Sequence, residues 1–270
     1  MKPMSDRASY PISCDERWPN LPWQIISAEP LSPQMNMAMD EVLTDRVGRR
    51  ERVPTLRFWA WSAPCVVLGR FQSVRNEVRE DALAEHGIEL VRRISGGGAM
   101  FIEPAGAITW SLYLPETFVD GLSFPESYAF LDSWVVSGLR DLGIDAWYAP
   151  LNDITSSQGK IGGAAQARRS GAVLHHTTIA YDMNTELLAQ VLRIGEEKLS
   201  DKGTRSAEKR VDPLRRGTGM TRDAIVEALS ARFRGLTGAE PAVLLPEERA
   251  AAQLRVDERF GRDEWVRILP

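Results

Sequence analysis

Three consecutive glycines, residues 96–98, follow directly after the segment VRRIS at residues 91–95. A glycine loses more backbone freedom on ordering than any other residue and adds no side chain for packing, so neither a helix nor a strand interior favours such a run. Glycines do permit close backbone approach, and successive N–H groups can then point into one concavity that suits an anion. With Arg93 and Ser95 beside it, the run predicts a loop that binds a phosphate or a carboxylate. An ordinary flexible hairpin loop is the alternative.

Two familiar phosphate-binding motifs do not fit this loop. Arg92 and Arg93 alternate on the incoming strand, so at most one points into the loop, and Arg93 is the nearer. A Walker loop needs Lys and Ser or Thr after its last glycine, where this chain has Ala99 and Met100. The spacing also differs from the Gly-x-Gly-x-x-Gly of a dinucleotide-binding turn. A charge that neutralises the ligand must therefore come from another segment.

Lys160 is the best candidate for that charge. It lies in the segment NDITSSQGKIGGAAQ, residues 152–166, between Gly159 and a glycine pair. An ordinary solvated turn lysine is the alternative, but the preceding Asn-Asp pair and the later His175 and His176 favour a site. Neighbouring residues on a strand face opposite ways, so the two histidines cannot both line one pocket. No cysteine or third histidine lies near them in sequence, which makes a zinc site unfavourable.

Composition narrows the kinds of partner and compartment. A net charge of −4 and a pI near 5.6 argue against a broad nucleic-acid surface, so any anion site is local. Two cysteines, Cys14 and Cys65, lie far apart in unlike contexts, as expected in a reducing, cytoplasmic compartment. No apolar run approaches the roughly 20 residues that cross a bilayer, and no membrane partner is expected. Residues 1–21 lack the apolar core of a secretory signal and are expected to be an irregular leader.

Hydrophobic periodicity predicts an α+β domain with a mixed or antiparallel central sheet flanked by helices. Residues 22–270 are expected to form one domain without a separate C-terminal accessory domain, because no linker-like segment interrupts them. We expect strands at residues 23–28, 54–61, 64–72, 88–94, 106–115, 145–150 and 172–183, the second and third forming a hairpin. We expect helices at residues 33–47, 74–87, 127–143, 184–194, 221–235 and 246–261, and a polar loop at residues 151–160.

Several motifs together resemble the lipoate-protein ligase family, whose fold is shared with biotin protein ligases and octanoyltransferases. They are RRISGGGAMF at residues 92–101, NDITSSQGKIGGAAQARRSGAVLHHTTIAYD at residues 152–182 and KLSDKGTRSAEKRV at residues 198–211. The resemblance implies a ligase that uses ATP and Mg²⁺ to convert lipoate or octanoate to an acyl-AMP. The acyl group then passes to a lysine of a lipoyl carrier domain.

The resemblance also implies roles for particular residues. Lys160 would be catalytic and would contact the carboxylate and the adenylate phosphate. His176 matches the second histidine of the family's His-His-Gly-Thr, and Asn152 and Asp153 match the pair on the nucleotide and magnesium side, with Asp153 a candidate Mg²⁺ ligand. The loop that wraps the acyl group and the phosphate would be Arg93, Ser95, Gly96, Gly97, Gly98 and Ala99, and the residues beside the acyl chain Gly162, Gly163 and Ala164.

Two other functions remain open at this point. An octanoyl or lipoyl transferase of this fold takes its acyl group from a carrier protein through a cysteine thioester, which requires a thiolate near the acyl carbonyl. No cysteine follows Cys65, and Cys65 lies in the apolar run PCVVLG, so the ligase is preferred to the transferase. A catalytically silent lipoate-binding relative is the third reading, because Ile102 and Glu103 replace the family's His-Asp pair. A single-domain ligase would work alone or with a separate accessory subunit.

Overall fold

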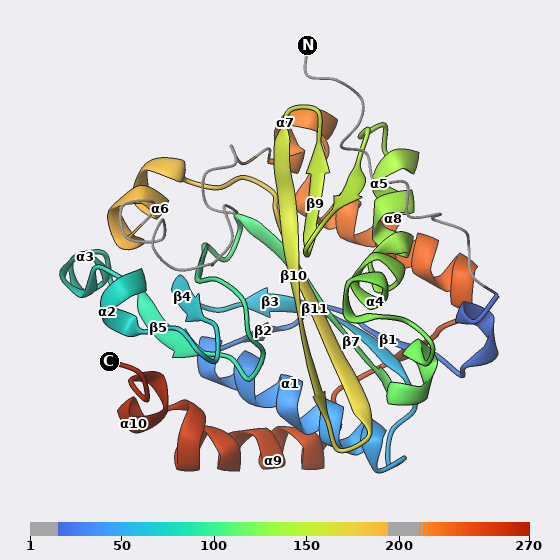
Figure 1. Ribbon diagram of the computed structural model, residues 1–270, viewed down its shortest axis with the longest axis horizontal. Helices are drawn as coiled ribbons and strands as arrows, with labels where there is room; N and C mark the ends of the chain where they lie inside the picture. The colour runs from blue at the N-terminus through green and yellow to red at the C-terminus, as the bar shows by residue number, and fades with distance from the viewer. Residues whose placement is uncertain (1–15, 194–210, 212) are drawn as a thin grey trace.

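Two β-sheets and the helices packed on them form the part of the chain that the computed structural model describes, residues 16–193, 211 and 213–270 (Figure 1). The strands are β1 (Gln24–Ile26), β2 (Pro30–Leu31), β3 (Thr55–Trp61), β4 (Cys65–Leu68), β5 (Glu89–Arg92), β6 (Met100–Ile102), β7 (Ala107–Pro115), β8 (Trp147–Ala149), β9 (Asp153–Ser156), β10 (Gly159–Arg169), β11 (Ala172–Ala180) and β12 (Glu240–Ala242). The α-helices are α1 (Pro33–Gly48), α2 (Val74–Glu77), α3 (Glu80–His86), α4 (Phe124–Leu131), α5 (Ser133–Asp141), α6 (Thr185–Val191), α7 (Leu214–Thr218), α8 (Arg222–Thr237), α9 (Pro246–Arg255) and α10 (Asp263–Val266). Short 3₁₀ turns η2 (Trp18–Asn20) and η3 (Glu116–Val119) and a π-helical turn η4 (Val256–Phe260) complete the elements.

The large sheet is mixed, as the sequence predicts. Its strand order is β12-β1-β3-β7-β11-β10-β9-β8, and β2 adds to β3. The pairs β12–β1, β1–β3 and β2–β3 are parallel, whereas every pair from β3–β7 to β9–β8 is antiparallel. The α+β prediction with a mixed central sheet is confirmed.

Helices cover both faces of this sheet because successive strand residues point to opposite sides. On β3, Phe58 packs into the cluster that contains residues of α5 and α8, while Trp59 packs into the cluster that contains residues of α1 and α9. Trp110 of β7 lies edge-on to Trp134 of α5, with ring centroids 5.5 Å apart. The arrangement places α1 directly beneath the strands that carry the site (Figure 1).

A small three-stranded sheet, in the order β5-β4-β6, carries the glycine loop between β5 and β6. The expected hairpin of β3 with β4 is wrong. Strand β3 pairs with β1, β2 and β7 of the large sheet, and both edges of β4 are taken by β5 and β6. The turn between β3 and β4 therefore moves the chain from one sheet to the other.

Two other local expectations differ from the structure. The helix expected at residues 74–87 is broken into α2 and α3, because Val78 is extended and forms an isolated bridge with Leu192. Gly87 ends α3 in the left-handed conformation, at φ 62°, as a C-cap glycine should. The expected polar loop at residues 151–160 contains β9 and the start of β10, since its alternating Asp153–Ser156 segment pairs with both β8 and β10.

The described part of the expected irregular leader belongs to the core. Trp18 in η2 is fully buried and contacts the rings of Trp23, Phe118 and Phe233. Residues 1–15 lie outside the described residues, and the single-domain organisation stays a prediction. Among the helices that the structure describes, none is long and apolar enough to span a membrane.

Candidate active site

A cavity of about 270 Å³ lies between the glycine loop, β10 and β11. That volume is slightly below the range typical of ligand pockets, about 300–1,000 Å³. Among the residues that the structure describes, the wall consists mostly of apolar residues and glycines and contains one lysine. Its predicted members are Arg93, Gly97, Gly98, Ala99, Asn152, Lys160, Gly162, Gly163, Ala164 and His176, and its other members include Glu77, Met100, Phe101, Ala165, Thr178, Met183, Leu188, Leu192 and Arg193.

The glycine loop is folded around the guanidinium of Arg93. Its Nε donates to Oγ of Ser95 at 3.0 Å, and its Nη2 donates to the carbonyls of Gly96 and Gly98 at 2.7 and 2.9 Å. A side chain at Gly97 is excluded, because φ is 91° and a Cβ would lie 2.9 Å from Arg93 Nη2. Burial lowers the pKa of Arg93 to about 10, so it stays charged at neutral pH. Arg93, which was expected to bind the anion, thus uses its donors to hold the glycine loop in place.

Arg92, the neighbouring arginine, points away from the cavity. Its guanidinium is fully buried and donates to the carbonyls of Val266, Gly69 and Gln72. Of this pair, only Arg93 lines the cavity. Arg92 instead ties the start of the loop to the C-terminal helix α10.

The Lys160 side chain passes beside Gly163, which is also on β10, and lines the cavity. Its Nζ lies 2.8 Å from Oδ1 of Asp153, and a Cβ placed on Gly163 would lie 3.2 Å from the same Nζ. The pairing of β10 with β9 shifts register between Lys160 and Gly162, as in a β-bulge, which re-aims the side chain. A Cβ at Gly162 would lie 2.5 Å from the Thr178 carbonyl oxygen, so the strand pair also requires that glycine.

Asn152 and Asp153 position β10. The Asn152 side chain donates to the Ala164 carbonyl at 2.6 Å, and the Asn152 carbonyl accepts from the Ala164 N–H at 2.9 Å. The Asp153 carboxylate is 3 % exposed and faces Lys160. Within the described ranges, no group of three or more His, Cys, Asp or Glu side chains could hold a metal ion. Asp153 as a magnesium ligand stays a prediction, and the structure gives it a cation partner in the protein itself.

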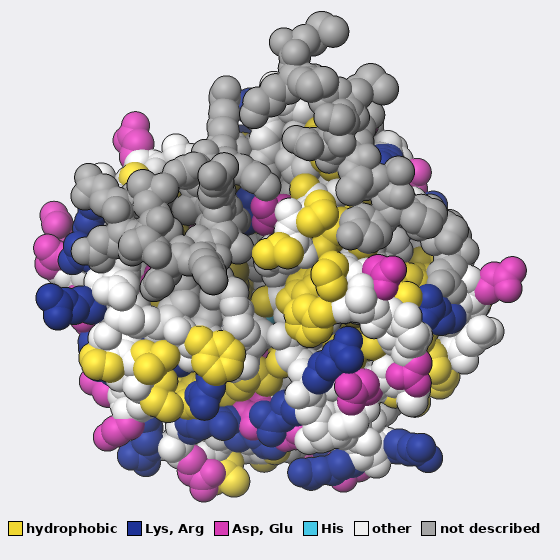
Figure 2. Space-filling view, in the orientation of Figure 1, with side chains coloured by type: hydrophobic (Ala, Val, Ile, Leu, Met, Phe, Trp, Pro, Cys, Tyr) yellow, Lys and Arg dark blue, Asp and Glu magenta, His cyan; other side chains and the backbone are white. Residues whose placement is uncertain are grey.

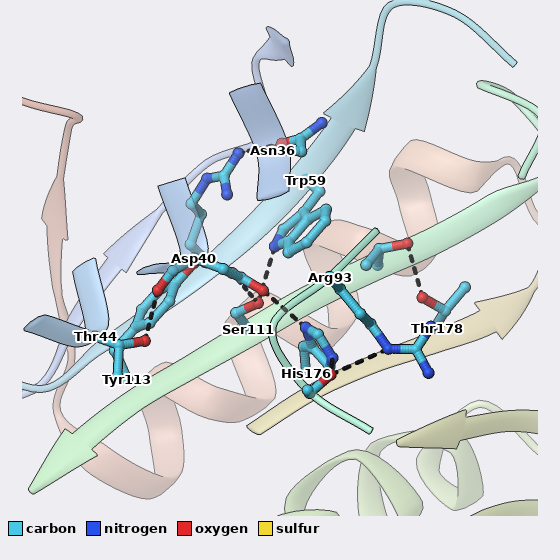
Figure 3. A network of polar contacts seen from close by, with 12 residues as sticks. Asn36, Asp40, Thr44, Trp59, Arg93, Ser111, Tyr113, His176 and Thr178 are labelled. Atoms are coloured by element: carbon cyan, nitrogen blue, oxygen red, sulfur yellow. Dashed lines mark hydrogen bonds and ion pairs between the residues drawn. The ribbon is translucent and has the colours of Figure 1, made fainter. Parts of the chain in front are cut away.

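A buried polar network lies behind the cavity wall (Figure 3). His176 of β11 presents Nδ1 to Oδ2 of Asp40 on α1 at 2.7 Å and Nε2 to Oγ of Ser95 at 2.6 Å. Oδ1 of Asp40 accepts from Ser111 at 2.8 Å and from Tyr113 at 2.7 Å. Burial lowers the pKa of His176, although Asp40 opposes the shift. His176 is therefore neutral at pH 7.

The pKa of His176 predicts how stability changes at acid pH. The unfolded chain binds a proton at this residue below about pH 6.5, whereas the folded chain resists protonation until a lower pH. The free energy of unfolding should therefore fall as pH drops below about 6.5, with a slope of up to about 1.4 kcal/mol per pH unit from this residue. Urea unfolding of the wild type and of His176→Gln between pH 7.5 and 5 measures the slope, with His86→Gln as an exposed control. Equal slopes for His176→Gln and wild type would contradict the assignment.

Cys65 is not placed for catalysis. It is fully buried on β4 within the cluster that contains α1, and burial, with Glu89 nearby, raises the pKa of its thiol. It does not line the cavity. Cys14 lies outside the described residues.

Sequence reasoning missed the residues that support His176 and those that close the apolar side of the cavity. Asp40 lies in the expected helix at residues 33–47, three residues from Met37 and from Leu43, both of which are buried. That spacing puts a carboxylate on the buried face of α1, which is a usable signal for a buried polar network. At the end of β10, Arg168 pairs with Glu116, and Arg169 pairs with Glu41 and Asp45.

Comparison with known proteins shows the family. Residues 32–234 match the model of the lipoyl protein ligase A/B catalytic domain. The octanoyltransferase LipM of Exiguobacterium sp. is 32% identical over 90% of this chain and 97% of its own length. The probable lipoate-protein ligase A of Mycoplasma genitalium is 30% identical over 89% of this chain and 70% of its own length. A bipartite lipoate protein ligase of Thermoplasma acidophilum, solved in a study with its E2 lipoyl domain, superposes with a TM-score of 0.77 at 28% identity and covers 92% of this chain and 97% of its own.

These relatives correct the expected reaction. Octanoyltransferases named LipM from six further bacteria match 90% of the chain at 26–31% identity. A transferase moves an acyl group that is already activated, so the expectation of an acyl-AMP-forming ligase, with the transferase less favoured, is wrong. The likeness supports attachment of lipoate or octanoate in general. On its sequence, fold and cavity, the chain belongs to the lipoyl protein ligase A/B catalytic domain family.

Proposed function

We propose that this protein is an acyltransferase that moves an octanoyl or lipoyl group from a thioester on a carrier protein to a lysine of a lipoyl domain. The observation that carries the proposal is the cavity itself, in which the Lys160 amine and the loop of Gly97 and Gly98 face one apolar space. Its small, largely apolar volume suits a short acyl chain. The similarity to octanoyltransferases over nearly the whole chain supports the reaction class.

The charges of the cavity suit acyl transfer from a thioester. Attack on the thioester carbonyl places negative charge on its oxygen, and preorganised donors that face that oxygen lower the barrier. Lys160 is held in place by Asp153, and the glycines of the loop, Gly97 and Gly98, line the same cavity. A thioester is already activated, so this reaction needs neither ATP nor Mg²⁺. A separate accessory subunit, which the sequence left open for a single-domain ligase, is likewise not required for this reaction.

A lipoyl domain is the proposed acceptor because the similar Thermoplasma protein was studied with such a domain. Figure 2 shows hydrophobic side chains gathered over the middle of the face on which β10 runs. Phe71, which is 79 % exposed, lies against the loop, since a Cβ on Gly96 would lie 3.8 Å from its ring. An apolar rim beside the cavity is suited to a docked protein domain.

The choice of donor tests this function. The full chain is incubated with a lipoyl domain and either octanoyl carrier protein alone or octanoate with ATP and Mg²⁺, and intact mass spectrometry follows the lipoyl domain. We expect octanoylation from the carrier thioester without ATP, and none when the acceptor lysine is replaced by arginine. Modification only in the presence of ATP and Mg²⁺ would contradict the proposal, and so would binding of lipoate without any modification.

Cys65→Ser is the matched control in the same assay. Because Cys65 is buried away from the cavity, the variant should transfer octanoyl at the wild-type rate. If a folded Cys65→Ser protein lost transfer activity, the thiol of Cys65 would be required for the reaction.

A further inference from the structure

Three side chains from distant segments form a hydrogen-bonded series behind the cavity wall, within the network that Figure 3 shows. Asp40 from α1 contacts His176 from β11 at 2.7 Å, and His176 contacts Ser95, at the start of the glycine loop, at 2.6 Å. The three residues are 2 %, 6 % and 1 % exposed. A hydroxyl, an imidazole and a carboxylate in this order are the parts of an activated serine nucleophile.

The chemistry of each group fixes which atom donates. An ionised carboxylate only accepts, so Nδ1 of a neutral His176 carries the proton and donates it to Asp40. Nε2 is then an acceptor, and the Ser95 hydroxyl donates to it. The second oxygen of Asp40 is held by the hydroxyls of Ser111 and Tyr113, which fixes the carboxylate. The series is therefore oriented to draw a proton from Ser95.

We propose that Ser95 receives the acyl group as a covalent ester, with His176 as the general base and Asp40 as the positioning residue for His176. The inference rests on the proposed transferase function. Ser95 would then act as the nucleophile, a role that a cysteine has in the transferases of this fold.

Both half-reactions balance. In the first, the Ser95 proton passes to Nε2 of His176 while Oγ bonds to the thioester carbon; the C–S bond breaks, and the leaving thiolate takes the proton from His176. In the second, the neutral amine of the acceptor lysine attacks the ester carbonyl. Its proton passes through His176 to the Ser95 oxygen as the C–O bond breaks and the amide forms.

Ser95 lies directly behind the cavity wall. Its two hydrogen-bond partners, Arg93 and His176, line the cavity, as do Gly97 and Gly98 next to it in the chain. The proposal requires the loop to move outward so that the acyl carbonyl reaches Oγ, and open space lies beside two of its glycines. A Cβ on Gly98 would meet nothing within 4 Å, and one on Gly96 would meet only the ring of Phe71.

Arg93 and Lys160 provide positive charge for the two oxygens that become negative during the reaction. Arg93 donates to Oγ of Ser95 at 3.0 Å, which stabilises negative charge that develops on that oxygen. Lys160 faces the same cavity from β10 and is placed for the carbonyl oxygen of the acyl group. The nucleophile and the oxyanion donor thus approach from different walls.

A second buried pair in the fold provides the matched control. Nε2 of His175 contacts Asp132 at 2.8 Å, and Asp132 also accepts from Thr177 at 2.9 Å. All three side chains are almost completely buried, and none of them lines the cavity. Asp132→Asn therefore changes an equivalent Asp–His contact without touching the proposed nucleophile.

The experiment traps the covalent intermediate. The full chain is mixed with p-nitrophenyl octanoate without a lipoyl domain; released p-nitrophenolate is followed, and the protein is analysed by intact mass and peptide mapping. We expect one octanoyl group, mapped to Ser95 and stable to neutral hydroxylamine, as an oxygen ester is. Ser95→Ala should form none, whereas Ser95→Cys should form a thioester that neutral hydroxylamine cleaves. Ser230→Ala, a buried serine of α8, should acylate like wild type.

Asp40→Asn tests the positioning role. The acylation rate constant should fall by about 10²–10⁴-fold, the usual contribution of a general base, while KM for the ester stays the same. Asp132→Asn should keep the wild-type rate constant per folded molecule. Equal effects of the two substitutions would show a merely structural role for Asp40 and would overturn that part of the inference.

The outcomes separate the two proposals. If the wild type transfers octanoyl from its carrier thioester to the lipoyl domain but carries no acyl group on Ser95, and Ser95→Ala still transfers, the inference fails and the proposed function stands. If the wild type forms octanoyl-Ser95 from the ester but modifies the lipoyl domain only with ATP, the proposed function fails. An unfolded Ser95→Ala protein leaves the decision to Ser95→Cys, in which the absence of a thioester at residue 95 counts against the inference.

Discussion

Replacing Lys160 with methionine should lower the rate constant for octanoyl transfer by about 10²–10³-fold, the usual loss on removal of one oxyanion donor. Methionine keeps much of the length of the side chain, so Gly163 remains covered while the ammonium group is lost. The cation otherwise lies 2.8 Å from Asp153 and faces the cavity. Transfer from octanoyl carrier protein to a lipoyl domain, followed by mass spectrometry under single-turnover conditions, measures the effect.

Two comparisons separate the chemistry of Lys160 from its structural pairing. Lys160→Met removes the cation that faces the buried Asp153 carboxylate, so the double variant Lys160→Met/Asp153→Asn, which also removes that negative charge, should recover stability without recovering transfer. Arg234→Met removes a half-buried cation of α8 that does not line the cavity and should leave the rate constant unchanged. A Lys160→Met protein that is folded and transfers octanoyl within a few-fold of wild type would remove this side chain from the mechanism.

Replacing Arg92 with methionine should lower the free energy of unfolding by about 3 kcal/mol, because several buried carbonyls lose a charged donor at once. Nε and Nη2 donate to the Val266 carbonyl at 2.9 and 2.7 Å, and Nη1 donates to the carbonyls of Gly69 and Gln72 at 2.8 and 2.7 Å. For a chain of this size the midpoint of thermal unfolding should fall by roughly 6–12 °C. Urea unfolding and calorimetry measure both quantities.

Arg75→Met is the control for that substitution, since Arg75 is exposed on α2, close in sequence to the same segment. It should change the free energy of unfolding by no more than about 0.5 kcal/mol. Because Arg92 ends β5 immediately before the glycine loop, Arg92→Met should also weaken octanoyl transfer, and Arg75→Met should not. A stability of Arg92→Met equal to that of wild type would mean that water replaces the lost donor.

The elements that the sequence predicts well are those with a strong local period. Helix α1, strand β7 and strand β11 match their expected segments within a few residues, because their apolar residues recur at the spacing of the element. The pairing of β3 and β4 could not be predicted in the same way. Both are apolar strands separated by a short turn, and only the long-range contacts of β5, β6 and β7 assign them to different sheets.

The residues of the candidate site were predictable only where the local sequence is unusual. The glycine loop and Lys160 were accessible from sequence because runs of glycine and a lysine flanked by glycines are locally unusual. Asp40 was not, since an acidic residue on an amphipathic helix is ordinarily solvated, and its burial depends on Ser111, Tyr113 and His176 from other segments. For Arg93, the sequence predicted a residue of the loop but not its contacts. Its guanidinium donates to the carbonyls of Gly96 and Gly98 in the loop itself.

The antiparallel ladder of β10 and β11 has a consequence for motion. Gly163 is paired with Thr178 and Ala165 with His176, and Gly163 is also paired with Asp153 on the other side. A fluctuation of this ladder would carry Lys160 and His176 together and preserve the spacing between them. Slow amide hydrogen exchange is expected along both strands and faster exchange at residues 96–98. When a ligand enters, the glycine loop is therefore expected to move relative to β10 and β11. Lys160 and His176, which lie on these two strands, keep their alignment.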